Sequence, residues 1–192
     1  MAVRDLNADL DETIDRARKQ TDQLHEYSHT FEVLGYGILQ PKAVKDEYLL
    51  LAPPNHDEAV EMLEKQSREV ADQWRETHDT VERELLYLFP QYESAVHGLL
   101  TGETSEDELR EDFGVEPGLE EYRHRVEDVI QINGDYRVLQ HRIEDLSHSL
   151  EKEDYPSPRE IRVEEDRWYS HHLERLEQLE FQEASELEAE DR

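Results

Sequence analysis

The chain of 192 residues contains no cysteine and no long apolar run. Without cysteine it has no disulfide, no thiolate metal ligand and no cysteine nucleophile. Its longest apolar stretches, such as YLLLA and LLYLF, are far shorter than the roughly 18 residues that cross a membrane. The amino-terminal MAVRDLNADLDE is charged where a secretory signal peptide needs an apolar segment. We therefore expect a protein that neither crosses a membrane nor enters the secretory pathway.

Basic residues are also scarce: five lysines and sixteen arginines stand against fifty acidic residues. They are scattered among the acids, so the chain lacks the basic patch that neutralises phosphates, and we expect no direct binding of nucleic acid. No glycine-rich phosphate loop and no Gly-x-Ser-x-Gly nucleophile turn occurs. The sequence therefore indicates no cofactor and no small-molecule substrate.

Negative charge is what the chain has in excess, with a formal net charge of −29. In molar salt the Debye length falls to about 3 Å, so carboxylates keep the surface hydrated without repelling one another across the protein. The composition favours an extreme halophile or one of its viruses. The protein would then lie in a high-salt cytoplasm or in a virus particle assembled there. The alternative is an acidic protein of ordinary salt that mimics nucleic acid or binds a basic protein.

Apolar residues recur at helical spacing in four long stretches, at about residues 5–34, 56–89, 118–152 and 158–188. The first seam alternates steps of four and three: Leu10, Ile14, Ala17, Thr21, Leu24, Ser28 and Phe31. The second seam consists of Val60, Leu63, Ser67, Val70, Trp74, Thr77, Val81, Leu85 and Leu88. The third consists of Leu119, Tyr122, Val126, Val129, Asn133, Tyr136, Ile143, Leu146 and Leu150. These patterns are typical of helices that pack along their lengths, as in coiled coils.

Glycine and proline mark the expected ends of the helices. We expect the first helix to stop near Gly35 and Gly37, and Pro90 to end or kink the second. The connection 35–55 contains YLLLA, which is either a short helix or an extended segment laid over the bundle. In the connection 90–117 we expect two short helices: one closes at Gly102, and the other begins with the capping box SEDE.

Two further signals concern the third and fourth long helices. Asn133-Gly134 is compatible with a β-hairpin, but the seam stays in phase across it, and we therefore expect a continuous helix with Asn133 at a core position. In SPRE, Ser157 is the expected cap of the fourth helix, followed by a proline at the first helical position. Its apolar face consists of Ile161, Trp168, His172, Leu176 and Leu179.

The pentapeptide HEYSH at residues 25–29 spells H-E-x-x-H, the zinc-hydrolase signature in which two histidines hold the metal and the glutamate activates water. At 100° per residue, His25 and His29 lie about 100° and about 140° from Leu24, the centre of the buried stripe. A metal held there would be open to solvent. No strands can precede the motif, and no third ligand is evident. We therefore interpret His25, Glu26 and His29 as an accidental match.

A di-metal centre inside a bundle uses Glu-x-x-His on two helices and a further Glu on each of two others. The pairs Glu26/His29 and Glu121/His124 have this spacing but lie outside the seams. A second cluster, His141, Glu144 and His148, shares one helix face and flanks the third seam. We treat two clusters as weak metal candidates, the HEYSH residues His25, Glu26 and His29 and the cluster His141, Glu144 and His148. We predict no catalytic, cofactor or metal residue.

These observations predict a single all-α domain over residues 1–192. We expect an elongated antiparallel helical bundle or coiled coil of three to four long helices, with short connecting helices. Because Ala, Thr and Ser at seam positions bury little area, we expect self-association through the seams or docking to protein partners. The predicted function is that of a non-enzymatic structural or adaptor subunit of a larger assembly. The alternative is a metal- or ligand-binding bundle: a carrier, a sensor or a di-metal oxidoreductase.

Overall fold

The structure, a computed structural model, describes residues 5–42, 44–51, 55–164 and 167. These residues are helical or connect helices, with no strand among them, so the predicted all-α class is confirmed. In chain order the elements are α1 (Leu6–Leu39), α2 (Lys45–Leu51), α3 (His56–His78), the π-helix η1 (Asp79–Leu85), α4 (Leu86–Thr101), α5 (Glu106–Phe113) and α6 (Leu119–Glu151). No helix within the described ranges is long and apolar enough to cross a membrane.

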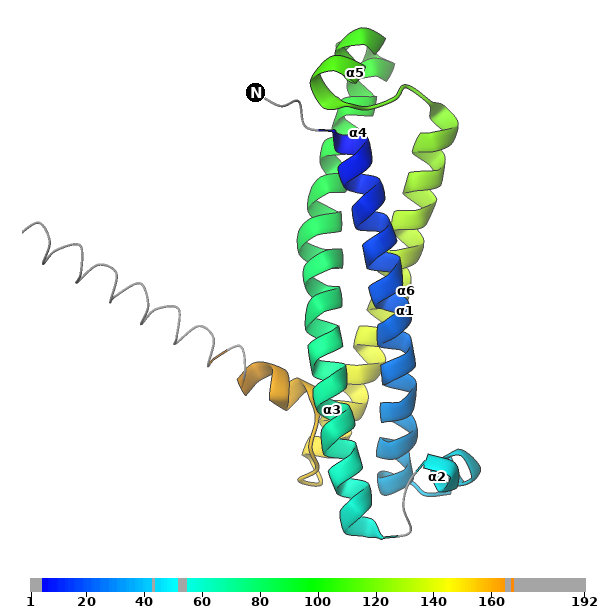
Figure 1. Cartoon of the computed structure of the whole chain (residues 1–192), viewed down its shortest axis with the longest axis vertical. Helices are drawn as coiled ribbons and strands as arrows, with labels where there is room; N and C mark the ends of the chain where they lie inside the picture. Colours follow the sequence, from blue (N-terminus) through cyan, green and yellow to red (C-terminus); the bar gives the residue numbers. More distant parts are fainter. Residues whose placement is uncertain (1–4, 43, 52–54, 165–166, 168–192) are drawn as a thin grey trace, which may run out of the picture.

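Three long rods lie side by side (Figure 1): α1, the joined helices α3, η1 and α4, and α6. α1 packs against the second rod and against α6, whereas α6 meets the second rod mainly at η1. In Figure 1 α1 runs down to the end that carries α2, the second rod returns to the end that carries α5, and α6 runs down again. The rods therefore share one long core with α1 at its centre.

The seams predicted from the sequence supply most of this core. All seven residues of the first seam are buried in α1. In the second seam every residue from Leu63 to Leu88 is buried, and Val60 is half-buried. In the third seam Leu119 was placed wrongly: it is 65% exposed, because α6 begins there, above the region where it packs on α1.

The predicted stop of the first helix is wrong, because α1 continues through both glycines to Leu39. The two glycines allow close packing instead. A Cβ at Gly35 would lie 3.0 Å from Leu146 Cδ2 of α6, and one at Gly37 would lie 1.9 Å from Tyr48 Cδ2 of α2. The connection that follows contains α2, the helical alternative for YLLLA.

Pro90 does not end the second rod, because α4 continues through it to Thr101. A proline ring collides with the carbonyl four residues before it, which here belongs to Leu86. Leu86 follows the wide turns of η1 and has ψ −9°, away from the roughly −42° of a regular helix. Its carbonyl is therefore turned from the ordinary helical direction, which makes room for the ring.

The remaining helix signals agree with the structure where it describes them. Gly102 ends α4 in the left-handed conformation, and Ser105 with Glu108 forms the capping box of α5. α6 is continuous across Asn133 and Gly134, so the hairpin alternative is excluded, and Asn133 is half-buried. Ser157 Oγ accepts a hydrogen bond from the Glu160 backbone N–H, and residues 158–164 are helical. The expected face residues Trp168, His172, Leu176 and Leu179 lie outside the described residues.

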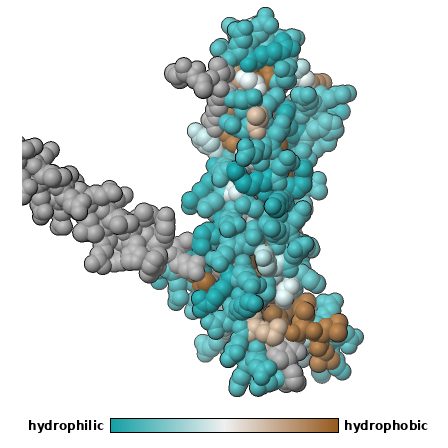
Figure 2. Space-filling view, in the orientation of Figure 1, coloured by the Kyte–Doolittle hydropathy of each residue, from teal (hydrophilic) through white to brown (hydrophobic). Residues whose placement is uncertain are grey.

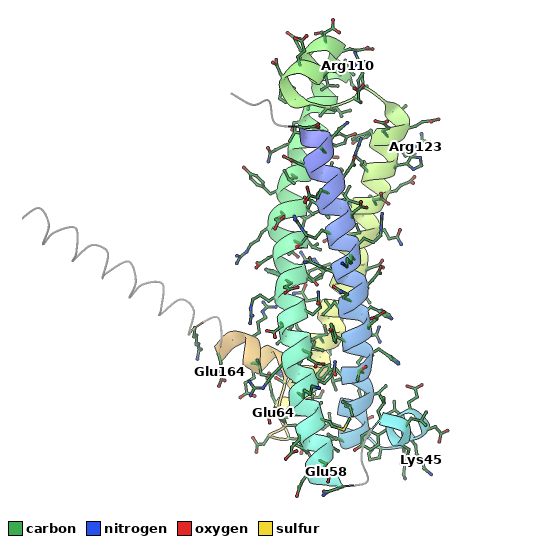
Figure 3. The ribbon with its side chains drawn as sticks, in the orientation of Figure 1. Lys45, Glu58, Glu64, Arg110, Arg123 and Glu164 are labelled. Atoms are coloured by element: carbon green, nitrogen blue, oxygen red, sulfur yellow. The ribbon has the colours of Figure 1, made fainter. Side chains whose placement is uncertain are left out.

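Arginine–carboxylate pairs connect the rods on the outside of the core. They are Arg16–Glu84, Arg18–Asp128, Arg125–Asp11, Arg137–Glu82 and Arg142–Glu32. Arginine suits these positions because its rigid planar guanidinium matches the geometry of a carboxylate, and Arg125 donates to both carboxylate oxygens of Asp11. Five of the 21 basic residues thus connect the rods, and the surplus acids face solvent (Figure 3).

Candidate functional site

The H-E-x-x-H residues lie on the outer face of α1. His25, Glu26 and His29 are all exposed, whereas the neighbouring Leu24 and Ser28 are buried. Two imidazoles and a carboxylate in open solvent lack the dry, shaped cavity that surrounds a catalytic zinc ion. Within the described part of the chain, no three His, Asp or Glu side chains converge on a point where a metal could bind.

The second candidate cluster is not brought together either. His141 pairs with Asp145 at 3.3 Å, while Glu144 accepts a hydrogen bond from Gln140 at 3.4 Å. His148 Nδ1 lies 3.1 Å from Arg159 Nη1. An open hollow of about 550 Å³ borders this part of α6, and its lining residues are Glu144, Asp145, His148, Ser149, Lys152 and Arg159. The cationic side chains of Lys152 and Arg159 in this lining compete with any metal ion for the carboxylates of the hollow.

A polar cluster that the sequence did not single out lies where α3 and η1 meet α6. His78 Nδ1 and the Tyr136 hydroxyl share a hydrogen bond of 2.9 Å. The guanidinium of Arg162 lies over the ring of buried Trp74, 4.3 Å from its centroid. Burial lowers the pKa of His78, and the charge of Arg162 lowers it further; burial raises the pKa of Tyr136. Both groups are therefore held neutral at pH 7, which suits a hydrogen-bonded packing site between helices.

The π-helix η1 begins directly after His78. Such segments are rare and often occur at functional sites, because the extra residue shifts the register of the side chains that follow. Here the shift keeps Val81 and Leu85 on the buried side. Tyr136 of the third rod and Arg162 of the helical segment 158–164 converge on this point.

An apolar surface lies at the end of the molecule that carries α2, and Figure 2 shows brown atoms gathered there on a mostly teal molecule. Leu49, Leu50 and Leu51 are 65%, 86% and 41% exposed. Tyr48 points inward against Gly37, which fixes α2 on α1 with its leucines directed outward. We call this surface the leucine end: Tyr36, Leu49, Leu50 and Leu51 with the exposed Lys42, Lys45, Asp46 and Glu47 around them. Lys45 is labelled on α2 in Figure 3.

A second surface of low charge lies on α4, near the other end of the rod (Figure 1). The one charged residue of α4 is Glu93, which is half-buried and accepts a hydrogen bond from the Tyr122 hydroxyl at 3.2 Å. We call the exposed residues of this helix the α4 face: Tyr87, Pro90, Ser94, His97, Leu100 and Thr101. An uncharged helix face is unusual on a chain with 37% charged residues.

No model of a known protein family, no curated protein and no solved structure matches this chain. Its function must therefore be argued from its own surfaces. The leucine end and the α4 face are the features of the described residues that depart most from the acidic surface.

Proposed function

We propose that the protein is a non-enzymatic structural or adaptor subunit of a larger assembly in an extreme halophile or one of its viruses. It would lie in the high-salt cytoplasm or in a particle assembled there. In this proposal an elongated antiparallel bundle, with seams of the coiled-coil type, works as a stiff spacer between protein partners. Direct nucleic-acid binding, membrane insertion and small-molecule turnover have no part in it.

The distribution of charge is the observation that carries this proposal. Residues 33–56 contain two lysines, one aspartate and one glutamate, and residues 85–102 contain Glu93 as their one charged residue. These two segments together carry a net charge of −1, so the rest of the chain carries −28 of the total of −29. In high salt the carboxylates keep a surface hydrated, and a surface without them is one that another molecule can cover at little cost.

The positions of these two surfaces support an adaptor. α2 lies at one end of the rods and α4 near the other, so two partners can bind without touching each other (Figure 1). The arginine–carboxylate pairs between the rods support stiffness, because each joins two helices and resists their sliding.

Fractionation by mass in molar salt, from cells or particles that produce the full chain, tests this proposal. We expect the chain in a complex larger than two copies of itself. Ser94→Glu places a charge on the α4 face and should release the chain from that complex. Gln131→Glu adds the same charge to the exposed side of α6 and should not. A complex that survives both Ser94→Glu and Leu50→Asp would contradict the proposal.

The runner-up function, a metal- or ligand-binding bundle, is favoured by one observation: the neutral His78–Tyr136 pair beside η1. Metal analysis of protein purified without chelators separates the two functions. Stoichiometric iron or zinc, lost in His78→Gln and retained in the exposed control His124→Gln, would put the binding function first.

A further inference from the structure

We infer that the leucine end binds a second copy of this chain, so that two molecules join end to end about a two-fold axis. This inference rests on the proposed function, because it names the occupant of one of its two docking surfaces. The α4 face is then left for a different partner.

The leucine end has a defined position, because α2 packs mainly against α1, which it contacts through Tyr48. The ring of Tyr48 fills the space that a side chain at position 37 would occupy, since a Cβ there would lie 2.4 Å or less from three of its carbon atoms. Leu49 and Leu50 consequently stand away from the bundle, each more than half exposed.

The charges of the leucine end favour a second copy over a basic partner. Two copies that approach through any of the acidic faces bring carboxylates together, whereas the leucine end has no net charge. A basic protein would be attracted instead to the acidic faces of α3 and α6, where the carboxylates are. The leucine end, like the α4 face, is therefore a part of the described surface where like molecules meet with little repulsion.

A two-fold interface brings a patch into contact with itself, so the patch must be self-complementary. The leucine end meets this requirement in two ways. Its centre is a run of three leucines, which pack against the same run of another copy. Its exposed Lys42 and Lys45 lie in the same segment as the exposed Asp46 and Glu47, so lysines of one copy can pair with acids of the other.

The size of the patch determines how strong this association is. Stable interfaces bury about 800 Å² on each partner, and a few side chains around one short helix supply less. We therefore expect a dimer that forms and dissociates with concentration, with a Kd in the micromolar range. Within an assembly, a second contact through the α4 face raises the effective concentration and strengthens this weak contact.

Sedimentation equilibrium of the purified full chain in molar salt, from low to hundreds of micromolar, tests the inference. We expect a monomer–dimer equilibrium, which Leu50→Asp shifts to monomer by at least about tenfold in Kd. Leu100→Asp is the matched control, because Leu100 is 71% exposed at the opposite end, and it should leave the Kd unchanged. Circular dichroism of each variant verifies that the helices are intact.

Charge reversal tests the two-fold symmetry itself. A variant with Lys42→Glu and Lys45→Glu, and another with Asp46→Lys and Glu47→Lys, should each dimerise less than the parent chain. Mixed together, they should form a heterodimer. A chain that stays monomeric at every concentration overturns the inference, as does a dimer that Leu100→Asp dissociates and Leu50→Asp does not. If the purified chain is monomeric while Ser94→Glu still releases it from its complex, the inference fails and the proposed function stands.

Discussion

Arg125 holds α6 to both other rods, and its removal should be the most costly single change on the outside of the bundle. Its side chain is 12% exposed. Nε and Nη2 donate to the two carboxylate oxygens of Asp11 at 2.8 and 3.0 Å, and Nη1 donates to the Tyr92 hydroxyl at 3.1 Å. The guanidinium carbon also lies 5.2 Å from the centroid of the Tyr92 ring. The hydrogen bonds to Asp11 raise the pKa of Arg125, so it is charged at every accessible pH.

The cost of Arg125→Met follows from what each partner then loses. The side chain of Asp11 is 54% exposed and becomes hydrated when Arg125 is removed. Loss of this ion pair should therefore cost as much as loss of a surface pair, about 1 kcal/mol or less. Tyr92 is fully buried, and its hydroxyl loses a charged donor, which costs about 1–3 kcal/mol. The lost contact with the Tyr92 ring adds about 0.5–1 kcal/mol. Allowing for the packing that methionine restores, we expect a loss of about 2–3 kcal/mol in the free energy of unfolding.

Urea unfolding in molar salt, followed by circular dichroism, measures this loss. Arg18→Met is the matched control: Arg18 pairs with Asp128 at 2.7 Å, but its side chain is 47% exposed, so we expect a loss of less than about 1 kcal/mol. Tyr92→Phe in the Arg125→Met background should cost little, because the hydroxyl has already lost its donor. The reasoning is refuted if Arg125→Met costs no more than Arg18→Met.

Three further predictions concern salt, Asn133 and His78. As salt falls from molar to about 0.1 M, the Debye length grows to about 10 Å and repulsion spans the bundle, so helicity or assembly should be lost reversibly, and mild acid should partly restore it; circular dichroism and light scattering decide this, and an unchanged signal would mean that the acids serve a basic partner. Asn133 Oδ1 is buried without a hydrogen-bond partner, so Asn133→Leu should raise the free energy of unfolding by about 1 kcal/mol in urea melts; a loss of stability would show that the amide has a partner in solution. Burial lowers the pKa of His78 in the folded state, so below the ordinary value of 6.5 the unfolded chain binds more protons and the free energy of unfolding decreases as the pH is lowered. In molar salt, His78→Gln should therefore lose less stability than the parent when the pH is lowered from neutral to about 5.5, and equal losses would contradict the assignment.

The long helices could be predicted from sequence because apolar periodicity is a local property. Leu10 to Phe31 and Leu63 to Leu88 are buried as their spacing predicts. The glycines of α1 could not be interpreted in this way. Gly35 and Gly37 read as a helix end, but each makes room for a side chain of another helix, Leu146 or Tyr48. Leu146 is distant in the sequence, and Tyr48 follows a connection whose path the sequence does not define. Neither contact could therefore be predicted.

The π-helix left a trace in the sequence that could have identified it. From Thr77 the seam takes two successive steps of four, to Val81 and then to Leu85, where a heptad alternates four with three. An extra residue in the turn absorbs this offset, and it also reorients the carbonyl of Leu86 that Pro90 would otherwise strike. Proline therefore continues a helix here for a reason that lies in the preceding turns.

The candidate sites were harder to predict than the fold, because a surface is defined by what packs beneath it. The sequence showed that Leu49, Leu50 and Leu51 are apolar, but it did not show that Tyr48 faces inward while these three face solvent. His78 stood between seam residues without any pattern of its own, and its partner Tyr136 comes from a different rod. The exposed positions of His25 and His29 followed from helical geometry alone.

The central claim is that the protein acts through its two surfaces of low charge, and carbene footprinting in molar salt tests it most directly. Photolabelling of the full chain, free and within its native assembly, gives the loss of accessibility at each residue. We predict protection in the assembly at Leu49–Leu51 and at Tyr87, Ser94 and His97, with none at the exposed Val138 and His124 of α6. Protection confined to the acidic outer faces of α3 and α6, with the leucine end and the α4 face still labelled, would contradict the account.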